Sequence, residues 1–179
     1  HLMGAVHLCK AVWPHMVAQQ YGRILMTTSS TGLYGNFGQA NYGAAKLAQV
    51  GLMQTLSIEG AKHDIRVNAL APTAATRMTE GLLPPEVMDA IKPEAVVPAM
   101  LVAVSEQAPS RMIFAAGAGT YEAAHITLTQ GVHLGLTPDT PERLLAALAQ
   151  VADRAGETVP MSGAEQGTNE VKQALATRR

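Results

Sequence analysis

Apolar and polar positions along the chain follow more than one period. Apolar residues recur at helical spacing over residues 1–20, although Pro14 lies inside this segment and predicts a kink or an early end. Further helices are expected at residues 41–63, 93–106 and 142–155. Short apolar runs, which are typical of buried strands, lie at residues 23–28, 65–70 and 111–116.

Loop signals separate these elements. Three glycines follow the first strand within a short space and predict a loop over residues 32–38. Residues 73–85 are rich in Thr, Pro and Gly, and we expect a mobile loop there with room for a substrate lid. The two glycines around Ala118 are not a dinucleotide fingerprint, since no third glycine follows at the required place. Two more irregular segments are expected: a loop at residues 131–141 and a weakly patterned, partly disordered tail at residues 156–179.

Three side chains around the first of these loops suggest acid/base chemistry. Tyr42 and Lys46 stand four residues apart at the start of a predicted helix, so both face the same side. A phenol has a reference pKa of about 10 and is a poor base at neutral pH unless a nearby positive charge favours its ionised form. Lys46 supplies such a charge, and Tyr42 would then exchange a proton with an alcohol or carbonyl oxygen. Ser29 would hydrogen-bond the same oxygen and hold it in place.

The spacing of Tyr42 and Lys46 is not specific by itself. Tyr-x-x-x-Lys arises by chance on amphipathic helices, and such a pair then belongs to an ordinary helix surface. A strand that ends in Ser-Ser-x-Gly, followed by a glycine-rich loop and then by Tyr-x-x-x-Lys at the start of a helix, is a much rarer combination. This conjunction favours a functional origin. Ser30 is expected to face away from the site and to cap or solvate the loop.

The same residues carry a resemblance to a known family. Ser29-x-x-Gly32, Tyr42-x-x-x-Lys46 and the run at residues 66–72 resemble the short-chain dehydrogenase/reductase superfamily. Within it, the runs at residues 35–42 and 92–94 are similar to the (3R)-hydroxyacyl-CoA dehydrogenase part of the peroxisomal multifunctional enzymes of type 2 and their bacterial relatives.

The resemblance implies a fold and a domain organisation. It covers about residues 1–135 and implies the C-terminal, catalytic half of an α/β domain with a Rossmann-like, doubly wound parallel sheet. Residues 136–179 are then expected to form a helical and partly disordered C-terminal extension. The family has glycines for a turn where this chain has Gly117 and Gly119, so the resemblance also implies a turn there.

The resemblance also implies an activity. It implies an NAD- or NADP-dependent oxidoreductase that interconverts a secondary alcohol and a ketone, with a (3R)-hydroxyacyl-CoA or similar substrate. Tyr42 would move the proton, Lys46 would tune Tyr42 and bind the nicotinamide ribose, and Ser29 would fix the substrate oxygen. The triad does not separate this reading from a 3-oxoacyl carrier-protein reductase.

The cofactor-binding residues implied by the resemblance extend to the segment after the second strand. Pro72 and Thr73 would lie near the nicotinamide, and the Thr76 hydroxyl fits the place where family members often bond the carboxamide. The family commonly has Pro-Gly where this chain has Pro72-Thr73, and a threonine in such a loop often only solvates the loop.

His1 differs from the other histidines. It aligns with the place where many family members keep an asparagine that steadies a proton-relay water, so a catalytic role is considered for it. The remaining histidines show no ligand spacing, and no metal site is predicted from His7, His15, His63, His125 and His133.

Composition narrows the classes of partner. The 179 residues suit a single domain, and 47% of them are hydrophobic, which is enough for a sizeable core. A formal net charge of −1 with scattered basic residues argues against nucleic acid and anionic membranes as partners. Cys9 permits no internal disulfide and suits a reducing compartment, so a cytoplasmic protein is expected. Small residues along residues 41–63 fit the helix pairing by which family members form homodimers or homotetramers, and burial of this helix inside a monomer explains them nearly as well.

One part of a dinucleotide site is missing from the pattern. No glycine-rich turn joins a first strand to a first helix, where a pyrophosphate would bind. We therefore expect a fragment, either part of a longer enzyme or a truncated chain. In the second case the chain would be a non-catalytic dimerisation or scaffold partner that keeps the triad as a relic. NAD and NADP are not separated by the sequence.

Overall fold

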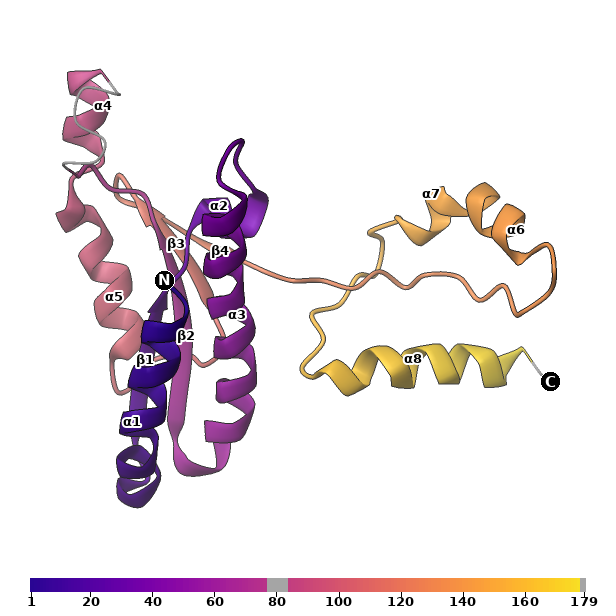
Figure 1. The fold of residues 1–179 in the computed structure, drawn as a ribbon, viewed down its shortest axis with the longest axis horizontal. Coiled ribbons are helices and arrows are strands. Elements are labelled where there is room, and N and C mark those ends of the chain that lie inside the picture. The colour runs from indigo at the N-terminus through magenta and orange to yellow at the C-terminus, as the bar shows by residue number, and fades with distance from the viewer. Residues whose placement is uncertain (77–83, 178–179) are drawn as a thin grey trace. The chain divides into compact units, whose positions relative to one another are not determined.

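The computed structural model describes residues 1–76 and 84–177. Its Cα positions divide into two compact units, His1–Ala124 and His125–Arg179 (Figure 1). Each unit is described separately below. The assignment of residues 1–135 to one catalytic part stays a prediction.

A four-stranded sheet organises the first unit. Its order is β1 (Gly22–Thr27), β2 (Ile65–Pro72), β3 (Ile113–Gly117) and β4 (Thr120–Ala124). The first three strands are parallel, and β4 pairs with β3 in the antiparallel direction. With helices on both faces, this is the Rossmann-like α/β architecture that was predicted.

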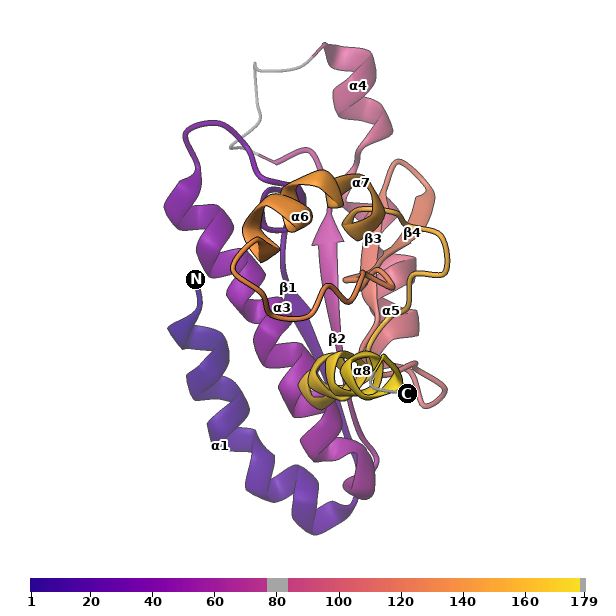
Figure 2. The same ribbon diagram turned by 90° about the vertical axis from the view of Figure 1, so that its right-hand side faces the viewer.

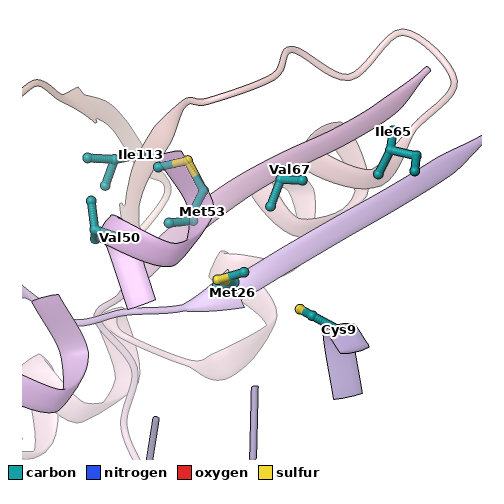
Figure 3. Packing of buried hydrophobic residues seen from close by; sticks show 8 residues of the cluster. Cys9, Met26, Val50, Met53, Ile65, Val67 and Ile113 are labelled. Atoms are coloured by element: carbon teal, nitrogen blue, oxygen red, sulfur yellow. The ribbon is translucent and has the colours of Figure 1, made fainter. Parts of the chain in front are cut away.

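Helices cover the two faces of the sheet because successive side chains of each strand point to opposite sides. Helices α1 (Met3–Gln19) and α3 (Ala40–Gly60) pack on one face, and α5 (Val97–Val104) packs on the other. Figure 3 shows the first of these cores, which gathers Cys9, Met26, Val50, Met53, Ile65, Val67, Ala69 and Ile113. The second core consists of Leu70, Val96, Ala99 and Ala116.

Most predicted elements are present with small shifts of their ends. Helix α1 continues past Pro14 to Gln19, so an early end is wrong. A short 3-10 helix, η1 (Ala61–His63), completes the predicted segment after α3. The helix predicted from residue 93 begins as a 3-10 turn, η2 (Pro93–Val96), before α5.

The loop predicted at residues 32–38 begins later than expected. Helix α2 (Ser30–Tyr34) occupies its first half. The helix forms because Ser29, in an extended conformation, accepts a hydrogen bond at Oγ from the Thr31 N–H over 3.2 Å and thereby caps it. Ser29, and not Ser30, is the capping serine, and Ser30 is exposed.

Strand β4 was not predicted. Ala118 and Gly119 both have positive φ angles, 50° and 75°, and they form the two-residue turn between β3 and β4. Such a turn matches the twist of an antiparallel hairpin, so the turn predicted here is confirmed. The strand itself is mostly exposed and therefore shows no apolar alternation in sequence.

Part of the predicted loop at residues 73–85 lies outside the described residues, namely 77–83. Residues 73–76 form no helix or strand. Helix α4 (Pro85–Ala90) starts at the last position of the predicted loop, with Pro85 in its first turn.

The second unit contains three helices within its described part: α6 (Thr140–Ala146), α7 (Leu148–Val151) and α8 (Gly163–Ala176). The helix predicted at residues 142–155 is thus divided at Ala147 and ends earlier. The tail predicted as weakly patterned and partly disordered is mostly helical, because α8 is rich in the strong helix formers Ala, Glu, Gln and Lys.

Within the described residues, no helix combines the length and the apolar character that crossing a membrane requires.

Candidate active site at the ends of the parallel strands

The predicted site residues gather at the carboxyl ends of the parallel strands. Strand β1 ends at Thr27 and β2 ends at Pro72, and the pairing of Thr27 with Leu70 aligns the two carboxyl ends. In open α/β sheets, ligands bind outside the carboxyl ends of the strands. The carboxyl ends of β1 and β2 therefore lie where a ligand site is expected.

Lys46 joins helix α3 to the end of β1. Its side chain is buried, with 8% of the residue exposed. The ammonium Nζ donates a hydrogen bond to the Thr27 carbonyl over 2.7 Å, and the buried Thr28 hydroxyl donates to the Lys46 carbonyl over 2.8 Å. This reciprocal pair fixes the ammonium at the strand end, a contact that the sequence did not indicate.

Gly32 allows this close approach. A Cβ atom at this position would lie 2.8 Å from the Lys46 Cβ and 2.9 Å from the Leu47 backbone nitrogen. Any side chain would push α2 away from α3, so glycine is required for close approach here. The Ser-x-x-Gly spacing thus has a packing reason as well as a place in the family motif.

Tyr42 lies one helical turn before Lys46, as the spacing predicted. The Lys46 Nζ is 5.7 Å from the centroid of the Tyr42 ring, a distance at which a cation is attracted to the ring. Within residues 1–76 and 84–177, the Tyr42 hydroxyl has no hydrogen-bond partner. The structure therefore brings these two predicted residues together and leaves the hydroxyl available to a ligand.

Ser29 lies at the same strand end, directly after Thr28. It is half-buried, and its Oγ accepts the capping bond from Thr31. A hydroxyl can accept and donate at once, so the O–H proton of Ser29 can still be given to another oxygen. The cap fixes where Ser29 stands, and this fits its predicted role of holding a substrate oxygen.

Pro72 and Thr73 lie at the end of β2, as predicted. Thr73 is exposed, and its N–H donates to the Ala116 carbonyl over 2.8 Å. Gly117 packs so closely that a Cβ there would lie 2.7 Å from the Thr73 carbonyl oxygen. Thr76 is also exposed and is the last described residue before the gap at 77–83. The roles of these residues toward a cofactor stay predictions.

His1 reaches the site from the start of helix α1. Its ring packs edge-on against that of Tyr42, with centroids 5.3 Å apart and an interplanar angle of 89°. The buried Gln49 donates a hydrogen bond from Nε2 to the His1 carbonyl over 2.7 Å. The sequence placed His1 near the chemistry, whereas Gln49 was missed, although it stands seven residues after Tyr42 on the same helix.

A pocket of about 420 Å³ lies against β1 in the first unit. Residues of α1 and β1 form most of its wall, and Lys46 and Gln49 complete the lining. Cys9 also borders it, and burial raises the pKa of its thiol, so this cysteine is kept protonated.

A cluster of ion pairs in the first unit lies away from this end of the strands, next to the start of β2. Asp64 accepts hydrogen bonds from Arg23 over 3.1 Å and from Arg66 over 3.0 Å. The Arg23 hydrogen bond, aided by Arg66 and the charges of both, lowers the pKa of the Asp64 carboxyl. Within the described residues, no group of three His, Cys, Asp or Glu side chains is placed to hold a metal ion.

The donors at the strand ends fit the nicotinamide end of a dinucleotide. The Lys46 ammonium has three N–H donors and gives one to Thr27, while the Tyr42 hydroxyl has no partner among the described residues. Two neighbouring ribose hydroxyls would match this set. The glycine-rich turn that a pyrophosphate needs does not occur in the sequence, so the fit concerns the nicotinamide end alone.

Comparison with known proteins agrees with this arrangement. The family described as short chain dehydrogenase matches residues 1–86, which include all of β1, α3 and β2. Residues 1–86 belong to the short-chain dehydrogenase family. The triad candidates and the residues at the end of β2 all lie within this part.

Relatives extend the similarity beyond residue 86. A short-chain type dehydrogenase/reductase of Mycobacterium tuberculosis is 42% identical over 89% of this chain, which covers 56% of the relative. Peroxisomal multifunctional enzyme A of Dictyostelium discoideum is 40% identical over 92% of this chain and 37% of the relative. The chain thus spans about half, or less, of the length of these relatives.

A solved structure supports the same likeness. Full-length peroxisomal multifunctional enzyme type 2 from Drosophila melanogaster superposes with a TM-score of 0.85 at 30% identity, over 99% of this chain and 33% of that chain. The chain therefore resembles the multifunctional enzymes of type 2, as the sequence motifs predicted.

Proposed function

We propose that this chain is the catalytic part of an NAD- or NADP-dependent oxidoreductase that interconverts a secondary alcohol and a ketone. The observation that supports this proposal is the Tyr42 hydroxyl, which has no partner among the described residues and belongs to a ring whose centroid lies 5.7 Å from the fixed ammonium of Lys46. The site residues belong to a family whose members are named as dehydrogenases. The chain spans only part of the length of its relatives, so we propose this activity for the whole protein as well.

Each triad residue has a separate task in this proposal. Tyr42 gives a proton to the carbonyl oxygen in the direction of reduction and takes it back in the direction of oxidation. The positive charge of Lys46 stabilises the phenolate that forms when the proton leaves, and its remaining donors bind the ribose. Ser29 donates a hydrogen bond to the same substrate oxygen and stabilises the charge that develops there.

The nicotinamide cofactor, when bound, supplies or accepts the hydride at its C4 atom. Pro72, Thr73 and Thr76 are proposed to orient the nicotinamide ring at the end of β2. The choice between NAD and NADP depends on a residue near the adenosine ribose, which belongs to the part of a dinucleotide site that these residues do not include.

We propose an acyl thioester as the substrate, with a (3R)-hydroxyacyl-CoA first. The relatives named as multifunctional enzymes match 92% and 90% of this chain. The 3-oxoacyl-[acyl-carrier-protein] reductase of Thermotoga maritima is 42% identical over only 46% of it. The greater coverage favours the coenzyme A thioester over the carrier-protein thioester, which stays the second candidate.

Assembly into a homodimer or homotetramer is proposed through α1 and α3. Leu47 and Ile58 of α3 are exposed apolar side chains, and Gly51 between them has open space at its Cβ position. Such a surface allows another helix to approach closely. Light scattering of the purified protein would measure the mass of the assembly. A cytoplasmic location stays a prediction.

Replacement of Tyr42 by phenylalanine tests the proposed function. Tyr42→Phe removes one hydroxyl and no packing volume, so we expect turnover to fall by about 10²-fold or more while the fold is unchanged. Oxidation of a hydroxyacyl-CoA would be followed by NADH or NADPH absorbance, and the fold by Trp13 fluorescence. Tyr34→Phe is the matched control, because Tyr34 is exposed on α2 and has no task in the proposal.

Full activity of the Tyr42→Phe variant would exclude Tyr42 as the acid/base. A fluorescence titration of the parent protein with NADH and NADPH tests the cofactor separately. Saturable binding supports the dehydrogenase proposal and identifies the cofactor. Absence of binding, together with an intact mass of 18.8 kDa, would favour the non-catalytic scaffold instead.

A further inference from the structure

The Tyr42 ring is held by two contacts and by no hydrogen bond of its hydroxyl within the described residues. Lys46 lies one helical turn after Tyr42, with its Nζ near the ring. The His1 ring packs edge-on against the Tyr42 ring, with the two centroids 5.3 Å apart. Edge-to-face aromatic pairs have a favourable geometry and restrict the rotation of both rings. His1 therefore acts as the neighbour that limits how far the Tyr42 ring can turn.

The position of His1 in turn depends on Gln49. Gln49 Nε2 donates to the His1 carbonyl over 2.7 Å, and Gln49 is only 5% exposed. The bond is costly to lose, since the buried Gln49 amide would be left without a partner, whereas His1 is exposed. His1 precedes helix α1, and this bond ties its main chain to α3.

Helix α3 carries the whole arrangement on one face. Tyr42, Lys46 and Gln49 follow one another at spacings of four and three residues, which places their side chains in one row. Figure 2 shows the N-terminal end of α1 beside this helix. Helix α3 therefore sets the distance between Tyr42, the acid/base candidate, and Gln49, which binds the main chain of His1.

We propose that Gln49 is a positioning residue of the candidate active site: it holds the His1 main chain so that the His1 ring keeps the Tyr42 hydroxyl aimed at the substrate oxygen. This inference rests on the proposed function, since it assigns the arrangement to proton transfer. A phenol hydroxyl lies at the far end of its ring, so a modest rotation of the ring moves it away from a reacting atom. Loss of the restraint lowers the fraction of time spent in the productive orientation.

Two pairs of variants separate this role from ordinary stabilisation. Gln49→Met keeps the size of the side chain and removes the hydrogen bond to His1. Gln54→Met is its matched control, because Gln54 lies on the same helix and accepts a hydrogen bond of 2.8 Å from Arg111. His1→Ala removes the ring contact, whereas His1→Phe keeps a ring without its nitrogens.

The first readout does not depend on activity. In the purified chain with ¹³C-labelled tyrosine, the Tyr42 ring signal is assigned by its loss in Tyr42→Phe. We expect Gln49→Met and His1→Ala to shift this signal in the same way, the double variant to add little, and Gln54→Met to leave it in place. An unchanged Tyr42 signal in Gln49→Met would overturn the inference whether or not the protein is active.

The second readout is turnover. We expect kcat of Gln49→Met and of His1→Ala to fall roughly three- to tenfold with the KM for the cofactor unchanged, and His1→Phe to restore most of the rate. A lowered melting temperature with unchanged kcat would reduce Gln49 to a structural role and overturn the proposal. If the parent protein has no turnover while the Tyr42 signal shifts as expected, the proposed function fails and the ring contact stands.

Discussion

The two units of the chain differ sharply in how much apolar surface they bury. Nearly all buried hydrophobic side chains belong to His1–Ala124, where two cores lie against opposite faces of the sheet. In the described part of the second unit, Ala147 is the only buried hydrophobic residue. Leu136 and Leu145 of that unit are exposed instead.

Polar contacts between segments hold the second unit together. Leu128 and Thr158 exchange backbone hydrogen bonds of 2.8 and 2.9 Å. The Thr129 hydroxyl donates to the Val151 carbonyl over 2.7 Å, and Gln173 donates to the Gln130 carbonyl over 2.9 Å. Such bonds each contribute little net stability, whereas burial of apolar surface contributes much more.

The comparison shows which part of the molecule can keep a reactive geometry. Lys46 is fixed by buried bonds in the unit with the cores, while the second unit is expected to open locally at low free energy. The candidate chemistry thus lies in the unit that contains the two hydrophobic cores. Substitutions that are matched between the two units test this contrast.

The largest difference is expected for large-to-small substitution of methionine. Met53 of the first unit is 0% exposed, and Met161 of the second is 62% exposed. Met53→Ala leaves a cavity in the core and should lower the free energy of unfolding by about 2–5 kcal/mol. Met161→Ala should change it by less than about 0.5 kcal/mol.

Urea unfolding measures both methionine variants. Trp13 packs against the core that contains Met53, so its fluorescence reports the unfolding of the first unit. Far-UV circular dichroism reports the helices of both units, including those of the second unit, to which Met161 belongs. Similar losses in the two variants would mean that Met161 is buried in the protein in solution, and the contrast between the units would then disappear.

A smaller difference is expected for added methyl groups. Gly117→Ala would place a Cβ atom 2.7 Å from the Thr73 carbonyl oxygen, so the end of β3 or of β2 must move. We expect a loss of roughly 1–3 kcal/mol and weaker cofactor binding, because Thr73 is a candidate cofactor residue. Gly163→Ala at the start of α8 meets no atom within 4 Å and should be neutral or slightly stabilising.

Thermal unfolding and the NADH titration measure the two glycine variants. If Gly117→Ala binds the cofactor as tightly as the parent protein, the close contact at Thr73 has no bearing on the candidate site.

The smallest difference in stability between the two units is expected when the pH is lowered. Hydrogen bonds from Arg154, and then from Thr127, lower the pKa of Glu157 below its usual value of 4.5. A lowered folded-state pKa means that the stabilisation is present above the unfolded value and is lost as pH falls through the folded one. The second unit should therefore lose amide protection as pH falls below about 4.5.

Hydrogen exchange followed over this pH range checks the acid effect. Glu157→Gln should remove most of the pH dependence, and Glu142→Gln, which lacks an ion pair within the described residues, should keep it. Asp64 forms comparable ion pairs with arginines in the first unit, but that unit is also stabilised by a hydrophobic core. Simultaneous loss of protection in both units would contradict the expected order.

Local geometry explains which features could be predicted from sequence. The spacing of Tyr42 and Lys46 fixes their common face, and apolar runs identify the parallel strands because these are buried on both sides. Strand β4 could not be found in this way, since its side chains are mostly exposed and its existence depends on pairing with β3.

Contacts between distant residues account for what was missed at the site. The bond from Gln49 to the His1 carbonyl joins residues 48 positions apart, and no local pattern encodes it. The bond from Lys46 to Thr27 is similar, because it depends on how α3 lies along β1. Helix α2 was missed for a different reason: its cap by Ser29 is readable in sequence, but the glycines that follow suggested a loop.

The burial of the Lys46 ammonium also determines the order in which amine reagents modify the lysines of this protein. The chain has five lysines, and Lys10, Lys62, Lys92 and Lys172 are all exposed. Reductive methylation or acylation will therefore modify these four first and Lys46 last, since its amine is bonded to Thr27 inside the fold. Surface lysines can thus carry a label or a tether to a solid support while the lysine of the candidate active site keeps its natural amine.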